Sequence, residues 1–154
     1  MAKPLEQIQR QLVSTIKLVI NAAAAKPSPP VGPALGQAGL NIMSFCKDFN
    51  AKTGNYKEGI PLRVFVRVYS DKTYDWILKT PPSSWLIKKA SGLERAADKP
   101  GHEVIGNISL KHIYEIAKVK RRDVPNVSLE ALCKNLISTC QSMGIKVAAR
   151  PGDP

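Results

Sequence analysis

Residues that could perform chemistry are few in this chain, and their spacing does not favour catalysis. The cysteines Cys46, Cys133 and Cys140 form no Cys-x-x-Cys pair. Cys133 and Cys140 fall on the apolar stripe of a predicted helix, where a thiol packs as a small hydrophobe rather than acting as a nucleophile. His102 and His112 have no second ligand at the spacing that a zinc site requires. We therefore expect no enzymatic activity, no metal site and no cofactor.

Glycine and carboxylate patterns lead to the same expectation. The segments "VGPALGQAG" and "SGLERAADKPG" contain neither a dinucleotide fingerprint nor the Lys-Ser/Thr of a P-loop. The carboxylates are dispersed among basic neighbours, which indicates ion pairs rather than a general acid and base. The odd number of cysteines also argues against a disulfide framework and favours a reducing compartment.

The charge balance indicates a polyanionic partner. The 154 residues include 23 Lys and Arg against 12 Asp and Glu, giving a net charge of +11. An excess of this size favours nucleic acid over a membrane surface. The uncharged run from Pro27 to Cys46 is long enough to span a bilayer, but its four prolines and three glycines exclude a transmembrane helix.

The first half of the chain predicts a sheet covered by a helix. Residues 16–20 alternate as a short strand, and residues 62–69 and 74–78 alternate as the two arms of a hairpin. Between them, Asn41 is suited to cap an amphipathic helix that Gly54 ends. Pro33 is suited to begin a short helical turn in the proline-rich segment, because a residue at a helix start needs no donor.

A domain boundary is predicted at Pro81 and Pro82, since two adjacent prolines cannot continue a strand. After them the hydrophobic period changes from 2 to about 3.6 residues. A short helix, "SWLIKKAS", is expected to be capped by Ser83 or Ser84 and ended by Gly92. A strand near residues 104–108 and a helix over 110–122 should follow.

The last predicted helix has the clearest pattern in the chain. Ser128 is placed to cap it, and Gly144 to end it. Its apolar stripe consists of Leu129, Leu132, Cys133, Leu136, Ile137, Cys140 and Met143. The opposite face carries short polar side chains: Asn135, Ser138, Thr139, Gln141 and Ser142. Such a face suits close contact with a polar surface better than simple exposure to water.

Two helices with basic residues nearby are compatible with a helix-turn-helix-like arrangement. The candidate phosphate-binding residues are Lys88, Lys89, Arg95, Lys99, Lys111, Lys118, Lys120, Arg121 and Arg122. Short polar side chains can meet the 2′-hydroxyls of A-form RNA, which gives RNA a small preference over DNA. The alternative that remains open is a helix-turn-helix regulator that binds DNA.

Four blocks, in this order, carry a resemblance to a known family: "PSPPVGPALGQ", "FCKDFNAKT", "KTPPSSWLIKKASG" and "SMGIKV". The sequence from about Thr15 to Val147 resembles the large-subunit ribosomal protein eleven family. The resemblance implies an α+β protein of two small domains. The N-terminal α/β domain would have a three-stranded antiparallel sheet and helices. The C-terminal domain would be a three-helix bundle with short strands and a homeodomain-like helix arrangement.

The corresponding division of the chain is an extension at 1–14, an N-terminal domain at 15–80, a hinge at 81–83, a C-terminal RNA-binding domain at 84–148 and a tail at 149–154. The resemblance implies that this protein is not an enzyme and not a homo-oligomer. Its partners would be large-subunit rRNA at the GTPase-associated centre, the stalk ribosomal protein and translational GTPase factors, with no membrane involved.

The resemblance also assigns site residues. Pro29, Pro30 and Pro33 would face factors and thiopeptide antibiotics, while Pro81 and Pro82 would form the hinge. The rRNA-binding residues would be Lys88, Lys89, Gly92, Arg95, Lys99, Lys111, Asn135, Ser138, Thr139, Ser142, Met143 and Gly144. Where many relatives have Gly-Thr-Ala-Arg, this chain has "STCQ", so Ser138 adds bulk and Gln141 removes a positive charge.

The predicted location is the mitochondrial ribosome, with a bacterial cytoplasm or a plastid as alternatives. "LKHIYEIAKVK" and Trp85 resemble mitochondrial members of the family. Leu5, Ile8, Leu12 and Ile16 are spaced as on a helix among basic residues. This pattern is compatible with a weak targeting segment or with an amphipathic extension.

Overall fold

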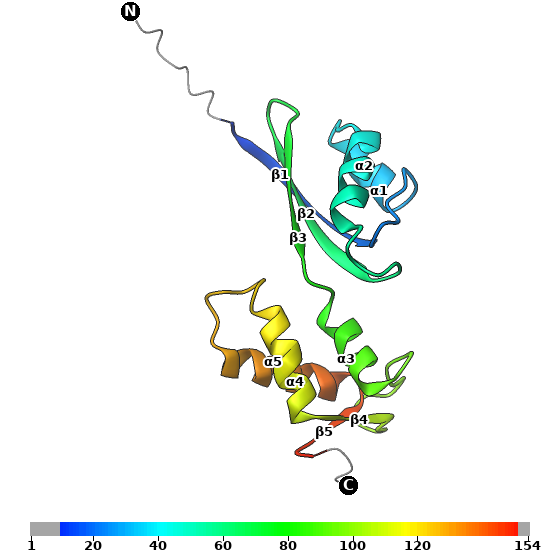
Figure 1. Ribbon diagram of the computed structural model, residues 1–154, viewed down its shortest axis with the longest axis vertical. Coiled ribbons are helices and arrows are strands. Elements are labelled where there is room, and N and C mark those ends of the chain that lie inside the picture. Colours follow the sequence, from blue (N-terminus) through cyan, green and yellow to red (C-terminus); the bar gives the residue numbers. More distant parts are fainter. Residues whose placement is uncertain (1–9, 151–154) are drawn as a thin grey trace, which may run out of the picture. The chain divides into compact units, whose positions relative to one another are not determined.

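A computed structural model describes residues 10–150, so the predicted features within residues 1–9 and 151–154 lie outside the described part. The chain divides into two compact units between Lys79 and Thr80, and each unit has its own hydrophobic core. In the described range, every helix is too short or too polar to cross a membrane. The α+β, two-domain prediction is confirmed (Figure 1).

The first unit is built on an antiparallel sheet in the order β1-β2-β3, formed by Leu12–Asn21, Pro61–Tyr69 and Tyr74–Lys79. The predicted hairpin is therefore confirmed. Strand β1 begins at Leu12 rather than near residue 16, because it pairs with the whole length of β2, as far as Tyr69. Leu12 and Ile16 consequently lie in a strand, and their helix-like spacing was misleading.

Helices α1 (Val31–Gln37) and α2 (Ile42–Thr53) lie on the same side of this sheet (Figure 1). The Asn41 side chain caps α2 as predicted, since its Oδ1 accepts from the Ser44 N–H at 3.2 Å. Phe45 and Phe49 of α2 are fully buried against the sheet. The alternation of β2 matches this cover, because its inward side chains, Leu62, Val64, Val66 and Val68, are buried.

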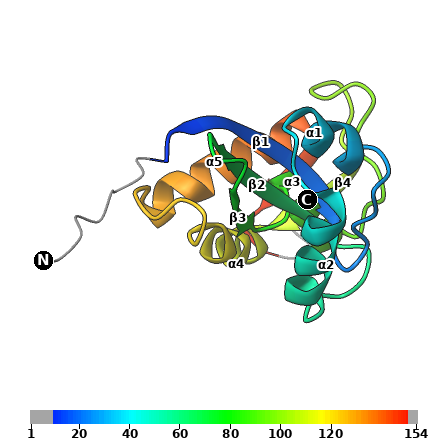
Figure 2. The same cartoon turned by 90° about the horizontal axis from the view of Figure 1, so that it is seen from above.

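The described part of the second unit contains three helices, α3 (Ser83–Ser91), α4 (Leu110–Lys120) and α5 (Leu129–Ser142). Helices α4 and α5 cross each other steeply in both views (Figure 1, Figure 2). Two short strands, β4 (Gly106–Ser109) and β5 (Ile145–Ala148), pair in parallel and join the start of α4 to the end of α5. The predicted three-helix bundle with short strands is confirmed.

Local details of the second unit differ from the predictions. Neither Ser83 nor Ser84 caps α3, because Pro82 occupies the N-cap and its carbonyl accepts from the N–H groups of Trp85 and Leu86. The strand predicted at 104–108 lies at 106–109, and the helix predicted to reach Arg122 ends at Lys120.

Candidate RNA-binding surface

Helix α5 presents one buried face and one polar face, as its sequence predicts. The Ser128 Oγ accepts from the Ala131 N–H at 3.2 Å and fixes the start of the helix. Leu132, Leu136 and Cys140 are buried in the core of the second unit. The opposite face carries Asn135, Ser138, Gln141 and Ser142, which are exposed, and Thr139, which is half-buried.

The hydroxyl groups on this polar face are held by the helix backbone. Ser138 Oγ donates to the Lys134 carbonyl at 3.2 Å, Thr139 Oγ1 to the Asn135 carbonyl at 2.9 Å, and Ser142 Oγ to the Thr139 carbonyl at 2.7 Å. Their hydrogens are therefore in use, while their oxygen lone pairs remain available. The surface offers acceptors to an incoming donor, such as an RNA 2′-hydroxyl.

The loop of residues 93–105 is docked on the end of α5. The Ala97 N–H donates to the Met143 carbonyl at 3.0 Å, and the Ile105 N–H donates to the Gly144 carbonyl at 2.9 Å. Gly144 has φ +74°, and a Cβ there would lie 2.4 Å from the Cβ of Ala97. Glycine is thus required both by the backbone conformation and by the close approach of the loop.

The docked loop carries two of the predicted basic residues, Arg95 and Lys99. Glu103 Oε1 accepts from the N–H groups of Asp98 (2.8 Å) and Lys99 (3.2 Å), which orders the backbone around Lys99. Arg95 forms an exposed ion pair with Asp98. Such a pair contributes little stability in water, so the guanidinium can exchange its partner for a phosphate at small cost.

The end of α3 leads directly into the same loop. Gly92 adopts the left-handed conformation, with φ 70°, that ends the helix, and the Leu93 N–H donates to the Lys88 carbonyl at 2.9 Å. Lys88 is half-buried and Lys89 is exposed, with the Lys89 Nζ 5.8 Å from the centroid of Trp85. Lys88 and Lys89 are therefore separated from the start of the loop by a single turn of backbone.

Two predicted residues are placed differently from this group. Met143 is only 7% exposed, so its side chain belongs to the core and only its backbone takes part in the surface. Lys111 is exposed in the first turn of α4, and among the described residues it forms no hydrogen bond or ion pair with the loop or with α5.

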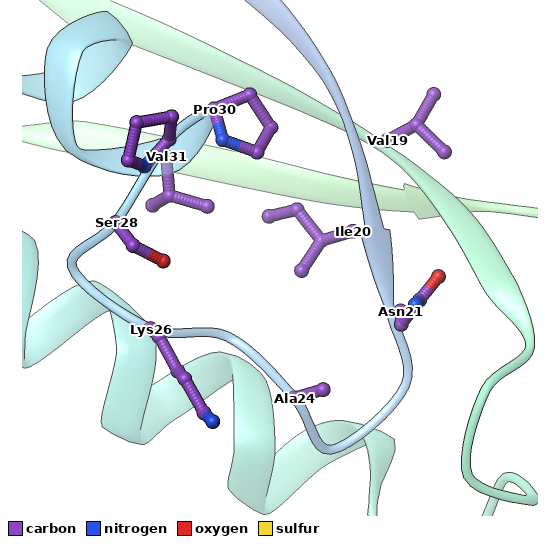
Figure 3. Close-up of a pocket in the computed structure, with 9 residues that line it drawn as sticks. Val19, Ile20, Asn21, Ala24, Lys26, Ser28, Pro30 and Val31 are labelled. Carbon is purple, nitrogen blue, oxygen red and sulfur yellow. The ribbon is translucent and has the colours of Figure 1, made fainter.

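In the first unit, the proline-rich segment lies at the surface beside the end of β1. Pro29, Pro30 and Pro33 are exposed, whereas Val31 is buried. A cleft of about 220 Å³ separates the segment from β1, and Figure 3 shows Ile20 and Val31 pointing toward each other across it. Pro33 lies in the first turn of α1, so the predicted helical turn is present, but the helix begins at Val31 rather than at Pro33.

The residues that follow β3 are fastened to the second unit. The Thr80 N–H donates to both carboxylate oxygens of Asp123, at 3.2 and 3.1 Å. Lys120 Nζ donates to the Pro81 carbonyl at 2.6 Å and lies 3.9 Å from the Asp123 carboxylate. The Lys120 and Asp123 side chains are only 7% and 13% exposed, so this contact is largely shielded from water.

Comparison with known proteins gives the same division of the chain. Residues 16–74 match the family model described as "Ribosomal protein L11, N-terminal domain", and residues 79–147 match "Ribosomal protein L11, RNA binding domain". The chain is also 46% identical, over 138 residues, to the "Large ribosomal subunit protein uL11" of Roseobacter denitrificans. The match covers 90% of this chain and 98% of that relative. The chain belongs to the ribosomal protein L11 family.

Members of the ribosomal protein L11 family are structural, non-enzymatic proteins, which confirms the prediction made for catalysis. The state of the thiols agrees with it. Burial raises the pKa of Cys140 to about 11 and also raises the pKa of Cys46. Both thiols therefore stay protonated near neutral pH, where a nucleophile would need a thiolate.

Sequence reasoning missed the residues that hold the candidate RNA-binding surface together in this ribosomal protein L11 chain. Ala97 and Glu103 were not singled out, although one contacts Gly144 and the other orders the loop around Lys99. The available signal was weak: a small residue, Ala97, in a polar loop and a glycine after α5. Their proximity depends on tertiary structure and has no local pattern.

Proposed function

We propose that this chain is a constituent of the large ribosomal subunit and that it binds folded rRNA through the polar face of α5, the docked loop 93–105 and the end of α3. The docking of the loop on Gly144 is the observation that carries the proposal. It brings phosphate-binding side chains to a helix face that carries short acceptors, within the unit that matches the RNA-binding model of the family.

The proposed mechanism is positioning rather than chemistry. Arg95, Lys99 and Lys89 supply contacts to phosphates, which give affinity without sequence preference. The oxygens of Ser138 and Thr139 accept from 2′-hydroxyls in a shallow minor groove, which selects RNA over DNA. Ser138 and Gln141 limit how closely and how strongly the end of α5 can bind, compared with relatives that have Gly and Arg there.

The finer assignment is the GTPase-associated centre at the base of the stalk, with the N-terminal unit meeting the stalk protein and translational GTPase factors. The exposed prolines Pro29, Pro30 and Pro33, and the absence of charge from Pro27 to Cys46, support a surface that touches its partners without binding phosphates tightly. We assign this surface to factors and thiopeptide antibiotics.

We propose that the hinge between the domains lies just before Thr80, rather than at Pro81 and Pro82 as the resemblance implies. Pro81 and Pro82 stiffen the connection, and the hydrogen bonds of Thr80 and Pro81 fasten it to the second unit. Rotation about the bonds that precede Thr80 would then move the N-terminal unit while the connection itself stays in place.

The compartment is proposed from two observations that point in different directions. The resemblance of "LKHIYEIAKVK" favours a mitochondrial ribosome, whereas the relative from Roseobacter denitrificans favours a bacterial cytoplasm. Co-sedimentation of the chain with mitochondrial or with bacterial large subunits decides between the two.

A binding comparison tests the proposed function. The full chain is titrated with the rRNA fragment of the GTPase-associated centre and with a DNA duplex of equal length at one fixed salt concentration. We expect clearly tighter binding to the rRNA fragment. Equal affinity for the two would contradict the proposal and would favour a regulator that binds DNA.

A further inference from the structure

One face of the sheet in the first unit is not covered by α1 or α2 (Figure 1). On β2, the side chains of Arg63, Phe65, Arg67 and Tyr69 alternate with the buried valines and therefore point to this uncovered face. A cation and an aromatic ring thus alternate along the central strand, with about 6.6 Å between successive members. We call this surface the open sheet face.

The neighbouring strands add more positive charge to the open sheet face. Lys17 of β1 and Ile77 of β3 pair with Phe65, and Val19 and Lys79 pair with Arg63. Paired residues project to the same face of an antiparallel sheet. Among these three strands, the face carries four cations, Lys17, Arg63, Arg67 and Lys79, against one carboxylate, Asp75. The Tyr69 hydroxyl donates to Asp75 at 3.1 Å.

Phe65 lies close to three of these cations. The centroid of its ring is 5.6 Å from Lys17 Nζ, 5.7 Å from Arg63 Cζ and 6.0 Å from Lys79 Nζ. Three cations this close to one ring are typical of a surface position rather than of a protein core. The ring is half-buried at the surface, and Val19 and Ile77 beside it are 51% and 37% exposed.

The kind of charge favours RNA over an acidic protein as the occupant. Protein interfaces are depleted in lysine relative to the rest of the surface. Here two of the three cations beside the ring, Lys17 and Lys79, are lysines. Aromatic rings among cations are the features that bind single-stranded nucleic acid, because bases stack on the rings while the cations hold the phosphates. Only an unpaired base can stack on the ring of Phe65, so an RNA that uses this ring is single-stranded there.

We propose that the open sheet face of the N-terminal unit is a second RNA-binding site, which takes a short single-stranded segment by stacking on Phe65 and by phosphate contacts from Arg63, Arg67 and Lys17. This site is separate from the RNA-binding domain that the family model assigns to residues 79–147. It does not depend on the function proposed for α5 and the loop 93–105, and either can fail without the other.

The test uses the nitrogen-15-labelled full chain and a 12-nucleotide oligouridine, followed by amide chemical shifts. Residue-resolved shifts separate the two units in one titration. We expect shifts in residues 62–69 and in the paired parts of β1 and β3. Phe65→Ala should weaken binding at these amides about tenfold, in keeping with the loss of one stacked base, whereas Phe65→Tyr should retain it.

Charge variants complete the test. The double variant Arg63→Gln, Arg67→Gln should make the slope of log affinity against log salt, measured at these amides, less negative by about 1.4. Lys47→Gln with Lys57→Gln removes the same charge from outside the sheet and should leave that slope nearly unchanged. The proposal is overturned by RNA-induced shifts confined to residues 80–148, by an unaltered slope in the arginine variant, or by poly-glutamate shifting the same amides with equal affinity.

Discussion

Gly144 and Gly101 have similar backbone conformations, with φ +74° and +88°, but different surroundings. A Cβ at Gly144 would meet Ala97 at 2.4 Å and the Glu103 carbonyl at 3.0 Å, whereas a Cβ at Gly101 would meet nothing within 4 Å. We predict that Gly144→Ala lowers the free energy of unfolding by about 2–4 kcal/mol, from backbone strain plus overpacking. Urea denaturation of the full chain measures this loss.

Gly101→Ala is the matched control for this prediction. It has the unfavourable φ without the steric conflict, so the cost should be near 1 kcal/mol. Gly144→Ala should also weaken binding to the rRNA fragment, because the loop that carries Lys99 must move away from α5. Equal stability losses in the two variants would contradict the importance of the close approach.

Cys140 provides a pH-dependent prediction. Burial raises its pKa from 9.0 to about 11, so between these values the unfolded chain loses the thiol proton while the folded chain keeps it. Deprotonation then favours unfolding, and the stability contribution falls as pH rises through this window. The loss should reach about 2 kcal/mol by pH 11, where the folded thiol is itself half ionised. It should be absent in Cys140→Ala.

The measurement compares urea denaturation of the wild type and of Cys140→Ala at pH 8 and pH 11 in the presence of a reductant. The variant is expected to be less stable at pH 8, since it loses buried volume, and to lose less stability on going to pH 11. Cys133→Ala, at a half-buried position, controls for the titration of other groups. Parallel pH profiles for the wild type and Cys140→Ala would refute the assignment.

At the scale of elements, α5 has one face that packs in the core and an opposite face that we propose for RNA recognition. Thr139 lies on the polar face, and its hydroxyl is bonded only to the helix backbone at Asn135. We predict that Thr139→Arg keeps the fold but weakens binding to the rRNA fragment at least tenfold, because a long side chain blocks the close approach of the helix. Gel shift with the folded variant, checked by circular dichroism, measures this.

Gln141→Arg is the companion variant in the same helix. Gln141 is exposed, and arginine supplies the positive charge that the family resemblance implies at this position. The added cation should raise affinity and increase the salt slope by roughly 0.7–0.9. If Thr139→Arg and Gln141→Arg change affinity in the same direction, the polar face of α5 has been assigned incorrectly.

Elements with local signals could be predicted from the sequence. Asn41 and Ser128 have side chains that cap their helices, and the alternation in β2 records which face is buried. The polar face of α5 could be predicted from the same helical period that defines its apolar stripe. These features depend on interactions within a few residues, so the sequence pattern alone is sufficient.

Elements that depend on distant partners could not be predicted in this way. Strand β5 forms because Ile145–Ala148 pairs with Gly106–Ser109, from which it is separated in the sequence by two helices. The full length of β1 depends on its register with β2. The N-cap of α3 was assigned to the wrong residue because the Pro82 carbonyl satisfies the first N–H groups without a serine side chain. The docking of loop 93–105 belongs to the same class.

At the scale of the whole molecule, the two units each have their own core, and the connection between them determines which residues move together. Thr80 comes directly after β3 in the chain, yet its N–H and hydroxyl both donate to Asp123 of the second unit. The backbone from Thr80 onward should therefore tumble together with the second unit. Nitrogen-15 relaxation of the full chain tests this, and Thr80 should follow the correlation time of residues 83–148.

Removing the charge of Asp123 should loosen this connection. Asp123→Asn leaves a weaker acceptor for Thr80 and takes away the carboxylate beside Lys120, whose side chain is 7% exposed. Breaking a shielded pair of this kind costs about 3–5 kcal/mol, so the second unit should lose stability while the first unit does not. Thr80→Val removes only the hydroxyl bond and should cost about 1 kcal/mol. Amide hydrogen exchange measures this effect. In Asp123→Asn, the Thr80 amide should exchange faster than the α5 amides. If the Thr80 amide is as protected as in the wild type, Asp123 does not hold the connection.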